Sequence, residues 1–460
     1  MRDVLSVLDG AAIVGVLLAV LIAGYVGARR RQDGTSTFIL AGRTLTLPVF
    51  VASLVATWYG SVLGATEFVI SYGLAFVLCF GVPYYVIALA YAQWLAKRIR
   101  QSEAVSIPDQ FRIVYGDRAA RFVACLMLII TIPASYQLSL ALITQSFTGW
   151  SLEASLLATS VFAFVYVAKG GLRSDAYANI VQSIVMFAGY IACLVACVTV
   201  VGSPSWLIAQ TPRELLDLPG PLGWTPIVVW FVIALQTFID PNFHVRTAAA
   251  RDAGIARRGI AYSVGAWIIF DTLQLFVGLY ALHVMGKGHG AQSALHLGMH
   301  VLPDVWRGVF VAGIVAAVMS ALDGYALVSG TIIGHDLRSG GEADSAPTRL
   351  RIGVVIALVI GGIVAYLLPS VIGILYRAAS ITVPAVLAPL LLSYTPYASR
   401  IRSHVIMLLI VPALASIAVM IAQETGIVSH PLAEPMLIGI VVSLCVLILS
   451  LRTHDRHPTA

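Results

Sequence analysis

The chain has 460 residues, of which 59% are hydrophobic and 11% are charged, and its mean hydropathy is +0.92. These values exclude an ordinary soluble domain, in which about 25% of residues are charged. The formal net charge of +6 comes from cations in short loops between apolar segments, so it predicts membrane orientation and no nucleic-acid surface.

Thirteen apolar segments follow one another along the chain. Each is close to the roughly 20 residues that a helix needs to cross a bilayer. The first is too long for a removable signal peptide and lacks a cleavage site, so we keep it as a span. The segments are residues 9–28, 46–71, 74–96, 119–146, 152–168, 176–202, 226–247, 259–285, 305–335, 351–368, 370–395, 403–422 and 434–451. We therefore expect an all-α integral membrane protein with about 13 transmembrane helices.

Positive charges are unevenly distributed between the two sides of this arrangement. With thirteen spans, 23 of the 28 Lys and Arg residues, Arg246 among them, fall in loops that share one side. The positive-inside rule makes that side cytoplasmic. We expect a multi-pass protein of the inner (cytoplasmic) membrane, with its N-terminus outside and its C-terminus in the cytoplasm.

Polar side chains interrupt several spans near their middle. Ser320 and Asp323 stand within the otherwise apolar residues 313–329. Such groups are costly in hydrocarbon, so they indicate a path for a solute or an ion. The side chains expected to line this path are Trp58, Tyr136, Gln137, Gln236, Thr237 and Gln274. This lining suits a small polar solute, although an interhelical hydrogen bond explains each Gln or Tyr equally well.

Two spans contain residues that favour a broken helix. The second span has Gly60 and Gly64, and the seventh has Asp240 followed by Pro241. A helix that opens at such positions frees backbone carbonyls inside the protein. Close packing at glycine and a simple proline kink are the alternatives. Asp240 and His244 are expected toward the cytoplasmic end of the seventh span, in a gate or interface cluster.

Four motifs occur in order along the chain. They read ASLVATWYG at residues 52–60, IPDQFRIVY at 107–115, GGLRSDAYANIVQ at 170–182 and AAVMSALD at 316–323. Together they resemble the sodium:solute symporter family (solute carrier 5-like), in a divergent bacterial-type form, over nearly the whole chain. The resemblance implies a leucine-transporter type of fold with a 5+5 inverted repeat, in which broken helices place the solute near the midplane.

The resemblance also implies a division of the chain. Residues 1–45 are expected to form an extra N-terminal transmembrane helix and a cytoplasmic loop. The first repeat, with core helices 1 to 5, is residues 46–202, and residues 203–225 form an extracytoplasmic loop. The second repeat, with core helices 6 to 10, is residues 226–395, and residues 396–460 form two C-terminal helices and a short tail.

The sodium site that the resemblance implies is incomplete in this chain. The matching positions are Ala56, Tyr59, Ala317, Ser320 and Ala321. The family has a second hydroxyl where Ala321 stands, and usually an aspartate where Asn179 stands. A hard cation needs oxygen ligands, so we expect sodium coupling to be weak or lost, with H+ in place of Na+ as the alternative coupling ion.

Several ionisable residues are candidates for gating or proton coupling. They are Glu67, Arg377, Asp323, Asp271 and Asp240. In the implied fold, Glu67 and Arg377 lie on helices that line the outer vestibule, so we expect them to pair. The alternatives are that Arg377 binds an anionic solute or reaches to the membrane interface. Asp323, midway across its span, is the best-placed proton carrier.

The sequence therefore predicts a secondary active transporter that moves a small polar organic solute across a lipid bilayer by alternating access. A membrane sensor that binds a solute and signals through a separate partner is the alternative. The chain has no nucleophile–base pair, metal-ligand spacing or P-loop, so we expect neither an enzyme nor a bound cofactor or metal. It predicts no particular solute and no oligomeric state.

Overall fold

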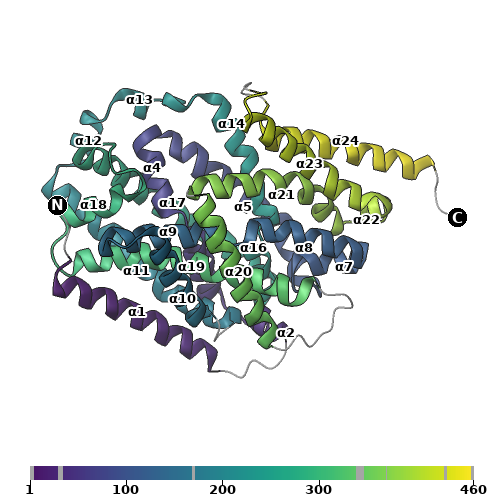
Figure 1. Cartoon of the computed structure of the whole chain (residues 1–460), viewed down its shortest axis with the longest axis horizontal. Coiled ribbons are helices and arrows are strands. Elements are labelled where there is room, and N and C mark those ends of the chain that lie inside the picture. Colours follow the sequence, from purple (N-terminus) through teal and green to yellow (C-terminus); the bar gives the residue numbers. More distant parts are fainter. Residues whose placement is uncertain are drawn as a thin grey trace.

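The structure is a bundle of helices. The computed structural model describes residues 5–29, 35–167, 171–337, 347–368, 370–428 and 433–456. Across these residues the only extended pairing is an isolated parallel bridge between Leu45 and Ala250. The helices pack against one another along most of the chain (Figure 1), so the predicted all-α architecture is confirmed.

Each of the thirteen predicted spans corresponds to helix in the structure. Among the described residues, ten helices are long and apolar enough to cross a membrane, two bent pairs qualify together, and Leu152–Phe164 is a shorter apolar helix. In chain order the spans are α1 (Val7–Ala28), α3 with α4 (Leu47–Trp58, Val62–Tyr72), η2 with α5 (Val77–Gly81, Val82–Trp94), α8 with α9 (Asp117–Thr131, Ala134–Thr148), α10 (Leu152–Val167), α11 (Gly171–Val200), α14 with α15 and α16 (Trp224–Ile233, Gln236–Ile239, Pro241–Ala249), α17 (Ala253–Met285), α19 with η5 (Trp306–Thr331, Ile332–Asp336), α20 (Pro347–Leu367), α21 (Val371–Ser393), α23 (Val405–Glu424) and α24 (Pro435–Arg456). Shorter helices between spans are α2 (Thr35–Leu40), η1 (Ala41–Arg43), α6 (Ala96–Gln101), α7 (Ile107–Tyr115), α12 (Pro204–Gln210), α13 (Arg213–Leu216), η3 (Gly220–Leu222), η4 (Gly290–Gln292), α18 (Ser293–Val301), α22 (Ala398–Ile401) and η6 (Arg402–His404).

Two spans are broken where the sequence suggests it. The axes of α3 and α4 differ by 57° across the turn that contains Gly60, and the seventh span bends by 41° before Pro241. A side chain at Gly60 would collide with the methyl group of Ala321 and the ring of Tyr136, so only glycine allows this approach. Asp240 is the N-cap of α16, and its carboxylate accepts a hydrogen bond from the Phe243 N–H at 2.9 Å.

The centre of the bundle is α19, which packs closely against α11. Most of its membrane-length window is buried, at 94% of residues. Glycines allow the backbones to touch. A Cβ atom at Gly189 of α11 would lie 2.9 Å from Phe310 Cα, and one at Gly313 of α19 would lie 2.9 Å from the Val185 carbonyl oxygen. Small residues at such crossings bring membrane helices close together, and here they place the polar side chains of α11 beside those of α19.

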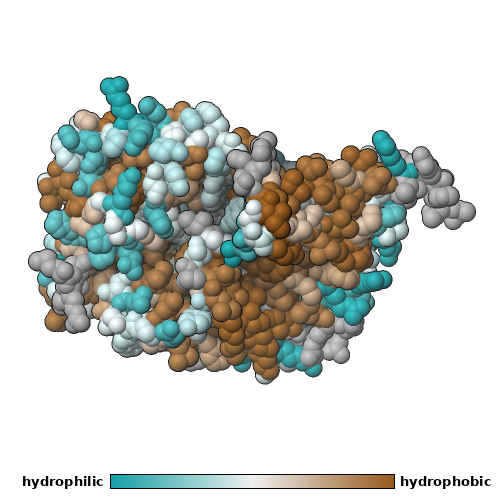
Figure 2. Space-filling model, turned by 45° about the horizontal axis from the view of Figure 1, so that its top comes forward, coloured by the Kyte–Doolittle hydropathy of each residue, from teal (hydrophilic) through white to brown (hydrophobic). Residues whose placement is uncertain are grey.

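Apolar side chains cover much of the outside of the bundle. Large exposed examples include Ile22 on α1, Leu157 on α10, Ile269 on α17 and Ile363 on α20. Figure 2 shows a broad hydrophobic area (brown) in the middle and right of this face, with hydrophilic residues (teal) spread over the left half and along the right and lower edges. An apolar surface of this extent is stable against lipid rather than water, so the chain is a multi-pass membrane protein.

A hydrogen bond and an ion pair join the start of α1 to the start of α19. One carboxylate oxygen of Asp9 accepts a hydrogen bond from the Val305 N–H at 2.9 Å, and Arg307 forms an ion pair with the other at 3.2 Å. In Figure 1 the start of α1 lies at the left of the molecule and the end of α24 at the right. The predicted orientation of the two ends in the membrane remains a prediction.

Candidate solute pocket and ion site

A pocket of about 120 Å³ lies between the two helix breaks. Its walls come from α3 and α4, from α5 and the π-helical turn before it, from α9, from the seventh span, and from α19 and α21. The lining residues are Thr57, Trp58, Ser61, Gly64, Phe80, Tyr84, Tyr136, Trp230, Ile233, Gln236, Asp240, Tyr325, Leu375 and Tyr376. Half of these side chains are aromatic, so the pocket offers ring surfaces together with a few polar groups.

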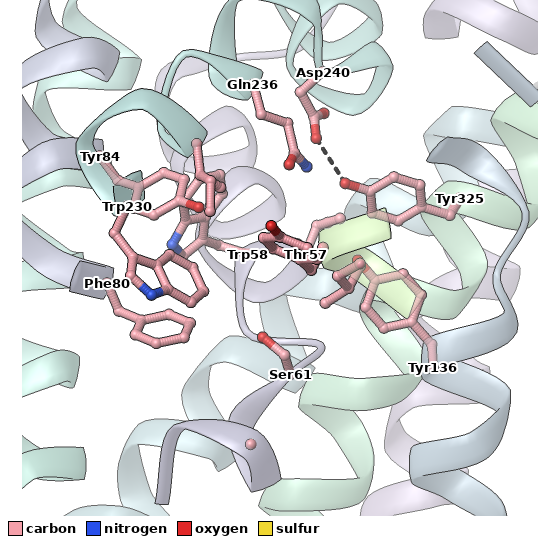
Figure 3. A pocket seen from close by; sticks show the side chains of 14 residues that line it. Thr57, Trp58, Ser61, Phe80, Tyr84, Tyr136, Trp230, Gln236, Asp240 and Tyr325 are labelled. Carbon is pink, nitrogen blue, oxygen red and sulfur yellow. Dashed lines mark hydrogen bonds between the residues drawn. The ribbon is translucent and has the colours of Figure 1, made fainter. Parts of the chain in front are cut away.

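The aromatic side chains stand on two sides of the pocket, as Figure 3 shows. On one side Trp58 packs edge-on against Tyr84, with ring centres 5.3 Å apart, and stacks on the buried Trp267 at 4.7 Å. On the other side Tyr136 stacks on Tyr325 at 5.0 Å. These contacts hold the rings in fixed orientations, so the walls are formed before a solute binds.

One carboxylate faces this pocket. Asp240 accepts a hydrogen bond from the Tyr325 hydroxyl at 2.6 Å, drawn as the dashed line in Figure 3, and Gln236 lies one turn before it. Among the described lining residues, Asp240 is the only acidic or basic side chain. The structure therefore places Asp240 at the break in the middle of the span. Its carboxylate caps α16 at that break, and its place in a gate or interface cluster toward the cytoplasmic end of the span stays a prediction.

Three of the side chains predicted as lining do face the pocket, and three do not. Trp58, Tyr136 and Gln236 are lining residues. Gln137 points the other way, where its amide donates hydrogen bonds to Ser160 Oγ at 2.7 Å and to the Leu358 carbonyl at 3.0 Å. Gln137 therefore joins α9 to neighbouring helices by hydrogen bonds. It points away from the pocket that Tyr136 lines because successive residues on a helix face different neighbours. Thr237 and Gln274 are buried in the protein outside the pocket lining.

The positions expected to bind sodium meet beside the pocket. Ser320 Oγ donates a hydrogen bond to Asn179 Oδ1 at 2.6 Å and lies 3.4 Å from Thr57 Oγ1. Asn179 Nδ2 in turn donates to Ser53 Oγ at 3.1 Å. Because Thr57 and Ser53 lie one turn apart on α3, these bonds join α3, α11 and α19 in one polar cluster.

The remaining expected ligands supply little oxygen to this cluster. The carbonyls of Ala56 and Tyr59 lie at the break, where they accept turn hydrogen bonds from the N–H groups of Tyr59 at 3.4 Å and Val62 at 3.2 Å. Ala317 lies inside the unbroken helix α19. The Ala321 methyl group is fully buried and faces the Gly60 turn.

A guanidinium group occupies the same cluster. Arg246 of α16 is 0% exposed. It donates hydrogen bonds from Nε to Ser53 Oγ at 2.8 Å, from Nη1 to Asn242 Oδ1 at 2.8 Å, and from Nη2 to Thr57 Oγ1 at 2.7 Å. Nη2 also forms an ion pair with Asp175 Oδ2 at 2.8 Å. The assignment of Arg246 to the cytoplasmic loop charges is therefore wrong, because α16 turns its side chain into the protein.

The spacing of four polar residues in the sequence indicates this cluster, although Asp175, Asn242 and Arg246 were not predicted as site residues. Asp175 and Asn179 are one turn apart on α11, and Asn242 and Arg246 are one turn apart on α16. Four polar residues at helical spacing on two membrane helices indicate two facing polar surfaces. Taken singly, neither Asp175 nor Arg246 is indicated as a site residue by the sequence, because each lies close to a predicted loop.

A second carboxylate is buried close to this cluster. Asp323 of α19 is 3% exposed, and its charge interacts with that of Asp175. Within the described part of the chain, neither of its carboxylate oxygens has a hydrogen-bond partner. A buried carboxylate without a partner is costly, because its charge is not compensated.

The other ionisable candidates lie elsewhere. Asp271 accepts hydrogen bonds from the hydroxyls of Tyr59, at 3.0 Å, and Tyr85, behind the wall of the pocket. Arg377 forms an ion pair with Glu424 at 2.8 Å, at the end of α23, so its expected partner Glu67 is not the one it contacts. Glu424 could not be ranked as a partner from the sequence, because it follows the implied core helices. Groups of three or more His, Cys, Asp or Glu side chains suited to a metal are absent from the residues described.

The fold and these two sites define a class of protein. A helical membrane protein with a pocket between two broken helices, and with a polar cluster beside it, has the architecture of a secondary transporter. A model of the sodium:solute symporter family matches residues 38–403, so the chain belongs to this family.

Known relatives and structures agree with this assignment. The chain is 24% identical to the sodium/pantothenate symporter of Escherichia coli (strain K12) over 382 residues, which cover 76% of this chain and 77% of the relative. It is 25% identical to the sodium/mannose cotransporter SLC5A10 of Bos taurus over 390 residues, which cover 72% of this chain and 64% of the relative. These relatives are transporters, not enzymes.

Two solved structures show the fold. One is a substrate-bound outward-open state of a Na+-coupled sialic acid symporter, with a TM-score of 0.78, 14% identity, and coverage of 97% of this chain and 98% of that one. The other is Mhp1, a nucleobase-cation-symport-1 family transporter in a closed conformation, with a TM-score of 0.56, 14% identity, and coverage of 92% and 96%. The leucine-transporter type of fold expected from the sequence is confirmed.

Proposed function

We propose that this secondary transporter moves a small, polar organic solute that is neutral or cationic, and that it takes the solute into the pocket between Trp58 and Tyr136. The observation that carries the proposal is the composition of the pocket: aromatic walls and a single carboxylate, Asp240. Aromatic faces attract cations and apolar groups, and an aspartate without a basic lining residue repels an anionic solute.

The pocket also supports a direction for access. Gly64, Trp230 and Tyr376 line it from the halves of their spans that lead to the predicted outer side. On the opposite side, the bridge between Leu45 and Ala250 joins the first residues before α3 to the residue after α16. We propose that solute reaches the pocket from the predicted outer side in this state, which would be one of the two end states that alternating access requires.

The experiment that tests this proposal has two stages. A thermal-shift screen of purified protein should find solutes that raise the melting temperature, because a ligand that binds only the folded state stabilises it. Hits should be quaternary ammonium compounds, amines or neutral amides rather than carboxylates. Uptake of a radiolabelled hit into proteoliposomes then follows. A hit that binds without accumulating favours the alternative, a membrane sensor, and a set of purely anionic hits contradicts the proposed pocket chemistry.

For the coupling ion, we propose that sodium contributes little and that Asp323 carries a proton. Of the two adjacent hydroxyls that the expected site uses on α19, only that of Ser320 is present, and it already bonds to Asn179. Asp323 is buried beside the cluster without a hydrogen-bond partner among the described residues, so proton binding removes an uncompensated charge. Uptake should persist when potassium replaces sodium and should rise with an inward proton gradient.

A further inference from the structure

The inference concerns Arg100, a half-buried side chain near the end of α6, and it rests on the proposed access to the pocket from the predicted outer side. Its guanidinium donates from Nε to the Ala250 carbonyl, and from Nη2 to the Arg251 carbonyl at 2.9 Å. Both carbonyls directly follow α16, the last part of the broken seventh span. Carbonyls at the C-terminal end of a helix attract cations, so Arg100 caps the inner end of that span.

A second arginine connects α6 to the start of the other broken span. Arg43, shortly before α3, donates from Nη1 to the Arg100 carbonyl at 3.2 Å and from Nη2 to the Ser102 carbonyl at 2.9 Å. The end of α6 therefore lies between the two broken spans. Its backbone carbonyls bind an arginine from one of them, and its own arginine binds the backbone of the other.

The backbones of the two broken spans also meet directly at this point. The Leu45 N–H donates to the Ala249 carbonyl at 3.1 Å, and the Arg251 N–H donates to the Leu45 carbonyl at 3.0 Å. These contacts, together with those of Arg43 and Arg100, are called the inner junction here. The inner junction lies on the side predicted to be cytoplasmic, opposite the proposed entrance to the pocket.

The inner junction is held in a costly conformation. Ala41, Gly42 and Arg43 have φ angles of 53°, 63° and 55°, in the left-handed region that only glycine adopts readily. Burial and the nearby charge of Arg100 lower the pKa of Arg43, so two like charges are brought close together. A strained turn and a pair of like charges favour separation, which suits a contact that has to open during function.

We infer that Arg100 is a positioning residue for transport. Its guanidinium holds the inner ends of both broken spans together while the pocket is reached from the other side, and its release from the carbonyls of Ala250 and Arg251 lets these ends separate. A planar fork of donors binds two neighbouring carbonyls at once, so the contact is specific. Its acceptors are uncharged, so breaking the contact leaves no buried acid without its partner.

The same helix supplies a matched control. Arg98 is exposed, donates a hydrogen bond to the Trp94 carbonyl within its own turn, and lies over the Trp94 ring at 4.9 Å. Arg98→Gln therefore removes the same charge from α6 as Arg100→Gln does, but it leaves the contacts of the inner junction in place. A difference between the two variants reports the hydrogen bonds of Arg100 rather than the net charge of the helix.

The test measures how fast a cysteine in the pocket reacts from each side of the membrane, without any solute. Ser61 lines the pocket and makes no side-chain capping bond to α4. Ser61→Cys is introduced into a background in which alanine replaces the five native cysteines. A membrane-impermeant thiol reagent is added to right-side-out and to inside-out vesicles. In this parent and in Arg98→Gln, labelling should be faster from outside.

Loss of the Arg100 guanidinium should open the inner side. In Arg100→Gln, labelling from inside should rise about tenfold or more, because hydrogen bonds from a charged group are lost. Arg100→Lys keeps the charge without the planar fork, so it should change labelling in the same direction. It also serves as the second variant if Arg100→Gln does not fold. Labelling from inside at the parent rate in both Arg100 variants, or an equal rise in Arg98→Gln, would overturn the inference.

Hydrogen exchange separates this inference from the proposed direction of access. The N–H groups of Leu45 and Arg251 should exchange about tenfold faster in the Arg100 variants than in Arg98→Gln, because the inner junction opens more often. Exchange at the same rate in all of these variants contradicts the role of Arg100. If the parent cysteine reacts only from inside, the proposed access fails instead, and the exchange rates still decide whether Arg100 holds the two spans together.

Discussion

Thr57 and Asp240 are the side chains that belong to both sites. Thr57 lines the pocket and accepts a hydrogen bond from Arg246, and Asp240 lines the pocket and caps the helix on which Arg246 lies. Neither residue could be assigned this double role from the sequence, because the role depends on which helices meet. The sequence did predict Trp58, Tyr136 and Gln236 as pocket residues, since aromatic and amide side chains near a helix break are costly to leave in lipid.

Removing the charge of Asp240 tests the preference for cationic or neutral solutes. Asn is also a good N-cap, so Asp240→Asn should keep α16 capped and the protein folded. Affinity for a cationic solute should fall about tenfold or more, which is about 1.4 kcal/mol, while affinity for a neutral analogue should change little. Binding is measured by the shift in melting temperature at several solute concentrations. Equal losses for charged and neutral solutes would mean that the carboxylate acts only through the shape of the pocket.

Removing the charge of Asp323 tests proton coupling. Asp323→Asn keeps the size of a side chain that has no hydrogen-bond partner among the described residues. Uptake into proteoliposomes should lose its response to an inward proton gradient, whereas solute binding and exchange should remain. The control is Asp304→Asn, on an exposed side chain next to α19 that pairs with Arg307. A proton-gradient response that survives Asp323→Asn directs attention to Asp271, which Tyr59 and Tyr85 hold by hydrogen bonds.

At the scale of elements, the two broken spans carry most of the site. Their positions were predictable, because Gly60 and Pro241 interrupt otherwise apolar helices. The direction of each half-helix was not, and it decides that Arg246 points inward from α16 toward Ser53 and Thr57. Side-chain direction on a short helix after a break depends on the bend angle, which no local pattern encodes.

The break at Gly60 should not tolerate a side chain. In Gly60→Ala the new methyl group meets the Ala321 methyl group and the Tyr136 ring, so the turn or the pocket wall must move. We expect a loss of stability of about 1–3 kcal/mol and a clear loss of solute binding. The matched control is Gly265→Ala on α17, where no atom lies within 4 Å of the added methyl group. There the change should be neutral or slightly stabilising, because alanine favours helix over glycine.

Restoring the missing sodium ligands should not by itself restore sodium coupling. Ala321→Ser with Asn179→Asp supplies the absent hydroxyl and carboxylate, yet the Arg246 guanidinium still bonds to Ser53 and Thr57 beside these positions. We expect the double variant to transport without sodium, and to gain a sodium response only when Arg246→Ala is added. Uptake is compared in sodium and potassium for the double and triple variants. A steep sodium requirement in the double variant alone would contradict this expectation.

At the scale of the molecule, the orientation in the membrane is the feature that remains a prediction, and it determines which half of the pocket faces outward. The cytoplasmic assignment rests on the loop arginines and lysines, of which Arg246 must now be removed because it is buried. The remaining loop cations still lie mostly on one side, so the predicted orientation is unchanged. The contact of Asp9 with Val305 places the start of α1 beside the start of α19, on the side predicted to be outside.

Cysteine accessibility can test this orientation in intact cells. A cysteine placed at Ser6, before α1, should react with a membrane-impermeant thiol reagent added outside, and one placed at Ser399, in α22, should react only after permeabilisation. Cys125 and Cys445 are exposed on apolar helices, so both are replaced by serine in the background used. Labelling of both sites from the same side would contradict the predicted odd number of spans. The helix α1 would then be the one to reassign. Labelling in the reverse order would keep the fold but reverse its orientation in the membrane, so that Gly64, Trp230 and Tyr376 would line the pocket from the cytoplasmic side.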